Sequence, residues 1–179
     1  MKPAVLVIDV QSILFDPEPQ PFESQITLGN INRVTQSARS RSVPVIFVQH
    51  EAANSVIEYG SAGWALQSDL LTHSSDLCVR KTTPDSFLNT NLRSLLDELQ
   101  VDSLIVCGYA SEFCVDTTVR RAAGLGYPVT LVADAHTTHD KIHATGAQIR
   151  AHHNATLPNI TSFGVKIEAV DVESLWAKR

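Results

Sequence analysis

The sequence predicts an α/β domain built around a central, mostly parallel sheet of six strands, and three observations lead to this fold class. Six short apolar runs recur along the chain. Segments with the helical spacing of apolar residues lie between the runs, and alternating strands and helices favour a parallel sheet with right-handed crossovers. The length of 179 residues suits a single domain that covers residues 1–179.

The six apolar runs are the predicted strands. Most are continuously apolar, which is typical of strands buried on both faces of a parallel sheet. The third run is the weakest, and the sixth alternates apolar and polar residues, so we expect the sixth strand at an edge of the sheet. In chain order, the runs cover residues 4–8, 43–48, 77–79, 103–107, 128–132 and 165–170.

Helices are predicted where apolar residues recur three and four positions apart. The helix after the fourth strand should stop at residues 124–126, which contain two glycines, and a last helix should cover residues 141 to about 155. Residues 51–75 are long for a connection, so we expect them to shape a pocket. The stripes are Leu92, Leu95, Leu96 and Leu99; Ile31, Val34 and Ala38; and Val115, Thr118, Val119 and Ala122.

Composition and charge exclude several classes of protein. Fourteen basic and nineteen acidic residues give a net charge of -5, so the basic surface typical of nucleic-acid binding is not expected. No apolar stretch approaches the length of a membrane span, and the start of the chain does not resemble a targeting signal. Three cysteines are an odd number, which argues against a disulfide framework and indicates a reducing, cytoplasmic setting.

Polar residues that follow the apolar runs are the candidate functional groups. Ligands of such sheets bind beyond the carboxyl ends of the strands, where the strand order reverses. Asp9 follows the first run, Lys81 the third and Cys114 the fourth. An acid at the end of a buried strand is costly unless it is paired. Taken singly, Asp9 could be a cap and Lys81 a solvated surface lysine, but the three together indicate chemistry.

Cys114 falls in the first turn of a predicted helix. A helix N-terminus and a nearby lysine both lower a thiol pKa, and the free N–H groups there could hold an oxyanion. A third buried cysteine is an equally simple interpretation of this position alone. Cys78 and Cys107 lie within predicted strands, so both are expected in the core.

Short motifs around these positions carry a family resemblance. They run in order from about residue 3 to residue 170 and resemble the isochorismatase-like cysteine hydrolases. Each motif is weak alone, but their order and spacing together are specific. The matching segments are residues 7–11, 45–50, Lys81 with Phe87, residues 107–115, 117–120 and 132–135, and His153 with Asn154.

The resemblance implies a three-layer α/β/α fold with an Asp9, Lys81 and Cys114 triad. It further implies a cis peptide between Tyr109 and Ala110 and an oxyanion hole formed by the N–H groups of Ala110 and Cys114. The implied reaction is cleavage of a non-peptide C–N bond in a small amide, ureido or carbamoyl compound through a thioester. The alternatives are isochorismatase-type hydrolysis of a vinyl ether and a catalytically silent α/β binding protein.

No metal or other cofactor is expected. Nicotinamidases similar to this chain often bind a metal through an Asp-x-His pattern after the second strand, and here that place reads Gln49-His50-Glu51. Phosphate-binding motifs are also absent from the sequence. The spacing of His136, His139 and His143 could place metal ligands on one helical face, but an exposed polar face is the simpler interpretation.

The expected partner is a small-molecule substrate bound in a largely apolar pocket. The resemblance also suggests a homo-oligomer, a dimer or a tetramer, in which residues 51–75 could take part. The pocket candidates are His50 and the aromatic residues Phe15, Trp64, Phe87, Tyr109 and Phe113.

Overall fold

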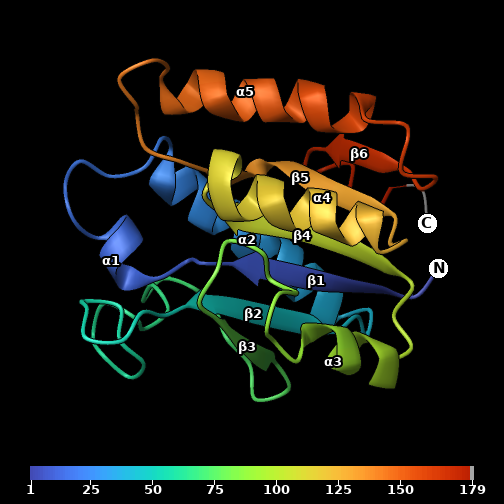
Figure 1. Cartoon of the computed structure of the whole chain (residues 1–179), viewed down its shortest axis with the longest axis horizontal. Helices are drawn as coiled ribbons and strands as arrows, with labels where there is room; N and C mark the ends of the chain where they lie inside the picture. The colour runs from blue at the N-terminus through green and yellow to red at the C-terminus, as the bar shows by residue number, and fades with distance from the viewer. Residues whose placement is uncertain (178–179) are drawn as a thin grey trace.

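The six predicted strands form one parallel sheet in the computed structural model, which describes residues 1–177 (Figure 1). Every strand pair is parallel, and the order across the sheet is β3-β2-β1-β4-β5-β6. The sixth strand lies at an edge, as its alternating pattern predicted. The strands are β1 (Pro3–Ile8), β2 (Val45–His50), β3 (Leu77–Lys81), β4 (Ser103–Tyr109), β5 (Val129–Thr137) and β6 (Ile167–Val170).

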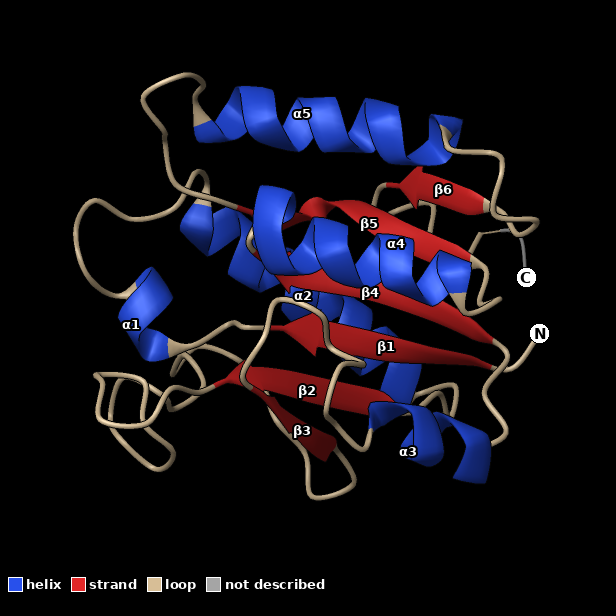
Figure 2. Cartoon of the chain, in the orientation of Figure 1, coloured by secondary structure: helices blue, strands red, loops and turns tan. Residues whose placement is uncertain are grey.

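Helices cover both faces of the sheet, which gives the three-layer architecture (Figure 2). The long helix α2 packs its apolar stripe on one face, and α3 and α4 pack on the other. Within residues 1–177, no helix combines the length and apolar character needed to cross a bilayer. The helical segments are α1 (Ser12–Phe15), α2 (Ser24–Arg39), α3 (Leu92–Glu98), the π-helical turn η1 (Ser111–Val115), α4 (Asp116–Gly124), α5 (Gly146–Thr156) and the 3-10 turn η2 (Leu157–Asn159).

The last predicted helix begins later than expected. α5 starts at Gly146 rather than at Lys141, because Thr145 closes a capping box with Gln148. In that arrangement the Thr145 hydroxyl accepts from the Gln148 backbone, and the Gln148 side chain accepts from the Thr145 N–H. The predicted start at residue 141 is therefore about five residues too early.

The strand order reverses between β1 and β4, and this reversal places the site. The chain builds β1, β2 and β3 to one side and then crosses to build β4, β5 and β6 on the other. At such a switch point the connections after the two central strands diverge and leave a crevice beyond their carboxyl ends. In Figure 1 that end of the sheet lies on the left, opposite the two chain termini, and α1 lies beyond it.

Gly108 permits the close approach of β1 and β4 directly below this crevice. Its φ is +120°, and a Cβ atom there would lie 2.1 Å from the backbone oxygen of Ile8. Because that oxygen belongs to a buried central strand, it cannot move aside cheaply. We expect Gly108→Ala to lower the free energy of unfolding by at least about 2 kcal/mol.

The control is Gly29→Ala, since a Cβ atom at Gly29 of α2 would meet nothing within 4 Å. Alanine in a helix interior is favoured over glycine by about 0.5–1 kcal/mol, so the control should be neutral or stabilising. Urea unfolding measures both variants. Equal stability of the two alanine variants would contradict the role assigned to Gly108.

Candidate active site

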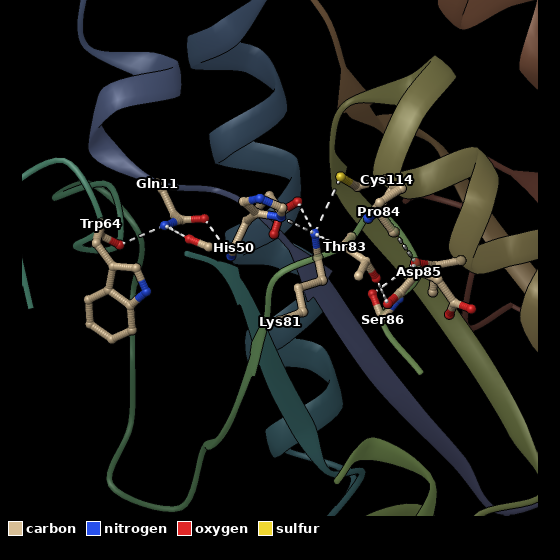
Figure 3. Close-up of polar contacts among 11 residues, drawn as sticks. Gln11, His50, Trp64, Lys81, Thr83, Pro84, Asp85, Ser86 and Cys114 are labelled. Atoms are coloured by element: carbon tan, nitrogen blue, oxygen red, sulfur yellow. Dashed lines mark hydrogen bonds and ion pairs between the residues drawn. The ribbon is translucent and has the colours of Figure 1, made fainter. Parts of the chain in front are cut away.

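Four neighbouring strands bring the polar candidates together at their carboxyl ends. Asp9 follows β1, His50 ends β2, Lys81 ends β3, and Cys114 lies in η1 just after β4. In Figure 3 the Lys81 side chain extends toward Cys114, with His50 beside it. The three residues expected at one edge of the sheet, Asp9, Lys81 and Cys114, are thus in contact at the switch point.

Asp9 and Lys81 form a buried ion pair. Lys81 Nζ donates to Asp9 Oδ2 at 2.7 Å, and the two side chains are 0% and 2% exposed. Asp9 has a φ of +50°, in the left-handed region that aspartate tolerates better than most residues. Its second oxygen, Oδ1, is buried and has no hydrogen-bond partner among residues 1–177. A buried acceptor without a partner is uncommon, so this oxygen is placed to accept a proton or a ligand N–H.

The Lys81 ammonium is shared among the groups around it. Besides Asp9, its nitrogen lies 3.3 Å from Cys114 Sγ, 3.2 Å from His50 Nδ1 and 3.1 Å from the Thr83 carbonyl oxygen. Since an ammonium can only donate, His50 Nδ1 accepts and the other ring nitrogen carries the proton. Burial and the positive charge of Lys81 both lower the pKa of His50, which favours this neutral ring.

Cys114 is a buried thiol rather than the low-pKa thiol that its helical position suggested. Burial, together with the negative charge of Asp9, raises its pKa to about 12, although Lys81 opposes both effects. The residue is only 5% exposed, so the loss of hydration outweighs the helix N-terminus. At neutral pH the resting group is therefore a thiol, and it needs a base close by to become a nucleophile.

The turn between β4 and Cys114 contains the two backbone N–H groups that are expected to form an oxyanion hole. The Tyr109–Ala110 peptide bond is cis, and Ala110 is buried. Cys114 is the fourth residue of η1, and the first N–H groups of a helix have no acceptor within it. The N–H groups of Ala110 and Cys114 therefore border the same turn as the thiol.

A metal ion does not fit among these residues. One ligand atom each from Asp9, His50 and Cys114 lies within 4.8 Å of the others. However, the ammonium of Lys81 lies 2.7 Å, 3.2 Å and 3.3 Å from those three residues. A cation bound there would have to approach this positive charge at a few ångströms in a buried setting, where charge repulsion is strong. Lys81 itself supplies the positive charge at this place.

Comparison with known proteins agrees with this arrangement. The model of the isochorismatase domain matches residues 3–162, which is most of the chain. The protein belongs to the isochorismatase family. A crystal structure of an isochorismatase family protein is 36% identical, covers 95% of this chain and 98% of its own, and superimposes with a TM-score of 0.85.

Several curated relatives have names that state an activity, among them a streptothricin hydrolase and a nicotinamidase. Streptothricin hydrolase of Streptomyces noursei is 35% identical over 138 residues, which is 76% of this chain and 50% of the relative. This chain thus spans about half the length of that protein. Nicotinamidase 3 of Arabidopsis thaliana is 28% identical and is matched over 90% of this chain and 81% of its own length.

Gln11 is a further residue of the site, and the sequence patterns did not predict it. Its side chain is fully buried and spans β2 and the long connection that follows. Gln11 Oε1 accepts from the N–H of His50 at 2.8 Å, while Nε2 donates to the carbonyl oxygens of His50 and Trp64 at 2.9 Å. The position of Gln11, two residues after Asp9 and so close to the carboxyl end of the first strand, was the signal available in the sequence.

The pocket candidates lie in different surroundings. His50 contacts Lys81, and Phe15 packs edge-on against Tyr109 with ring centroids 5.8 Å apart. Phe87 is buried in the core and stacks against Tyr127, whereas Phe113 is 56% exposed. The Trp64 ring packs against Tyr59. Participation of these residues in substrate binding stays a prediction.

The expectation that Cys78 lies in the core is wrong, whereas Cys107 is fully buried as predicted. Cys78 is exposed because β3 is an edge strand whose residues alternate between buried and exposed. Its thiol lies 3.2 Å from Gln49 Oε1. The feature that distinguishes Cys114 from the other two thiols is therefore its set of charged neighbours rather than its burial.

The histidines considered for a metal do not share a helical face. His136 is part of β5 and completely buried, while His139 and His143 lie between β5 and α5. Both ring nitrogens of His136 have protein partners, with Nδ1 2.8 Å from Ser111 Oγ and Nε2 2.8 Å from Asn154 Oδ1. A metal at His136 would have to displace one of these bonds.

His136 makes the fold sensitive to acid. Burial lowers its pKa from 6.5 to about 4. Between these pH values the unfolded chain binds a proton at His136 that the folded chain does not. The contribution of the neutral ring to the free energy of unfolding is therefore fully present above pH 6.5 and is lost as pH falls toward 4. The loss from this group amounts to about 3 kcal/mol.

The test is the pH slope of the unfolding free energy, measured with urea between pH 6.5 and 4.5. The slope of the natural protein should exceed that of His136→Gln by one proton, or about 1.4 kcal/mol per pH unit. Identical slopes for the two proteins would contradict the assignment of a neutral buried ring.

Proposed function

We propose that this protein is a cysteine hydrolase that cleaves the C–N bond of a small amide, ureido or carbamoyl compound through a thioester. The observation that carries the proposal is the contact of Lys81 Nζ with both Asp9, at 2.7 Å, and Cys114 Sγ, at 3.3 Å. A thiol, a carboxylate and a cation in contact at a switch point form a nucleophile with its base.

In the first half of the reaction Asp9 acts as base and then as acid. Its carboxylate takes the thiol proton as the sulfur of Cys114 attacks the carbonyl carbon, and Lys81 stabilises the negative charge that passes between them. The N–H groups of Ala110 and Cys114 hold the oxyanion of the tetrahedral intermediate. Asp9 then returns the proton to the leaving nitrogen, the C–N bond breaks, and an acyl thioester remains on Cys114.

The second half uses water in place of the thiol. Asp9 removes a proton from a water molecule, which attacks the thioester carbonyl, and the returning proton restores the thiol as the C–S bond breaks. The sum is one amide and one water converted to one carboxylic acid and one amine or ammonia. The raised pKa of Cys114 agrees with a thiol that loses its proton only when the substrate is present.

The relatives support hydrolysis and leave the substrate open. One is named a streptothricin hydrolase and another a nicotinamidase, and these names support an amide substrate here. The test is a screen of small amides, carbamoyl compounds and ureido acids for ammonia or amine release, with Asp9→Asn as the paired inactive variant. Release that is equal in the natural protein and in Asp9→Asn, or no release from any compound, would refute the proposal.

We also propose that the protein works as a homo-oligomer, a dimer or a tetramer. Support comes from exposed apolar side chains in the connection between β2 and β3, where Val56, Tyr59 and Leu71 are 68%, 58% and 48% exposed. Apolar groups gathered on one surface segment are typical of an interface. Light scattering should give a mass of at least two chains, and a single-chain mass at micromolar concentration would refute this.

The proposed setting is the cytoplasm, where thiols stay reduced. All three cysteines are free, and the exposed Cys78 and the functional Cys114 would both be open to oxidation elsewhere. Fractionation of the source cells with an antibody tests this, and recovery outside the cytoplasm would overturn it.

A further inference from the structure

The end of β5 holds the turn that carries the proposed oxyanion donors. This turn runs from Tyr109 to Cys114, and three of its side chains bond to residues at or just beyond the end of β5. The contacts are Tyr109 Oη with His139 Nδ1 at 2.7 Å, Ser111 Oγ with His136 Nδ1 at 2.8 Å, and Glu112 Oε1, which accepts from Thr138 Oγ1 at 2.9 Å.

The middle contact has a fixed direction. Asn154 Nδ2 donates to the Ala133 carbonyl oxygen at 2.9 Å, which orients the amide so that its oxygen faces His136 Nε2 at 2.8 Å. Nε2 must therefore carry the ring proton and donate to Asn154. This leaves a lone pair on Nδ1, so the hydroxyl of Ser111 is the donor.

The ring is held neutral, as this acceptor role requires. His136 is completely buried between α5 and η1, and burial holds its pKa at about 4. Arg150 and His153, both on α5, disfavour a positive charge on the His136 ring and so also lower its pKa. Arg150 is itself paired with Glu23. On the sheet side the neighbour is Gly108 of β4, which carries no side chain.

We propose that His136 is a positioning residue: by accepting the hydrogen bond of Ser111, it sets the orientation of the turn that presents the N–H groups of Ala110 and Cys114. This inference rests on the proposed hydrolase function. The two ring nitrogens of His136 bond to Ser111 and Asn154. Its effect passes through Ser111, which directly follows Ala110 and begins the turn η1 that contains Cys114.

Removing the donor hydroxyl tests this role. Ser111→Ala should lower kcat for amide hydrolysis about 10- to 100-fold with little change in KM, because misplacing the oxyanion donors affects the transition state more than binding. Ser111→Thr keeps the hydroxyl and should retain most of kcat. Full kcat in Ser111→Ala, or an equal loss in Ser111→Thr, would overturn the proposal.

Ser103→Ala is the matched control. Ser103 is also a buried serine, but it begins β4, whereas Ser111 follows the end of that strand. The hydroxyl of Ser103 has no hydrogen-bond partner within residues 1–177. The same loss of one oxygen there should leave kcat unchanged. A loss in Ser103→Ala equal to that in Ser111→Ala would mean that general destabilisation, rather than positioning, explains the result.

A second measurement separates this inference from the proposed function. Nitrogen NMR of the natural protein should show His136 as the Nε2–H tautomer, and Asn154→Ala should move the amide resonance of Cys114, although the side-chain hydrogen bonds of Asn154 go to His136 and Ala133. Neither readout requires turnover. If no amide is hydrolysed, the proposed function fails alone, whereas an Nδ1–H tautomer or an unmoved Cys114 amide overturns the positioning role.

Discussion

Replacing Cys114 with alanine is expected to lower turnover of any amide substrate by at least about 10⁴-fold, since the covalent step has no other nucleophile. The free energy of unfolding should fall by less than about 2 kcal/mol, because only one buried sulfur atom is lost. Steady-state ammonia release and urea unfolding measure the two effects. An undiminished rate would exclude the thioester mechanism.

Cys107→Ala provides a matched control for this prediction. Cys107 is as buried as Cys114 and lies on the adjoining strand β4, but its thiol faces the carbonyl oxygen of Leu6 and no charged group. Its removal creates a similar cavity and should leave turnover intact. Mass spectrometry of protein mixed briefly with substrate should find an acyl adduct on the natural protein and on Cys107→Ala, but not on Cys114→Ala.

Lys81→Met is expected to produce the largest loss of stability. The lysine side chain is 0% exposed, and its removal leaves the Asp9 carboxylate buried without a cation. Breaking one partner of a buried pair costs about 3–5 kcal/mol, mainly because the remaining charge is uncompensated. Turnover should be lost as well, since Lys81 also contacts the nucleophile.

The double variant Lys81→Met with Asp9→Asn separates the cause. It removes both charges, so urea unfolding at pH 7 should show recovery of most of the stability lost in Lys81→Met. Arg80 lies on the same strand β3 as Lys81 and pairs with Glu51 at the surface. Arg80→Met breaks this exposed pair and should change stability little. A double variant no more stable than Lys81→Met would show that lost packing, rather than the stranded carboxylate, causes the effect.

The location of the site followed from local features of the sequence. Continuous apolar runs marked the strands because a parallel sheet buries both faces, and the residue after each run therefore had to lie at its carboxyl end. That reasoning brought Asp9, Lys81 and Cys114 to one edge without knowledge of the strand order. It missed Gln11 because a buried glutamine resembles a surface residue until its partners from β2 and the long connection are in place.

Other properties depended on neighbours that are distant along the chain. Cys78 is exposed because β3 is an edge strand, and strand order is set by crossovers that the apolar pattern does not encode. The pKa of Cys114 is raised because segments from both halves of the chain enclose it and exclude water. The helix N-terminus, a local feature, predicted the opposite direction.

The sequence by itself determined the strands, their burial and the set of reactive groups at one end of the sheet, because these follow from the spacing of apolar residues along a few turns or a single strand. Only the tertiary structure decided which groups touch. The contact of Lys81 with Asp9 and Cys114, and that of His136 with Ser111, join residues 72, 33 and 25 positions apart. Such contacts depend on sheet order and on the exclusion of water, which arise only when the whole chain has folded.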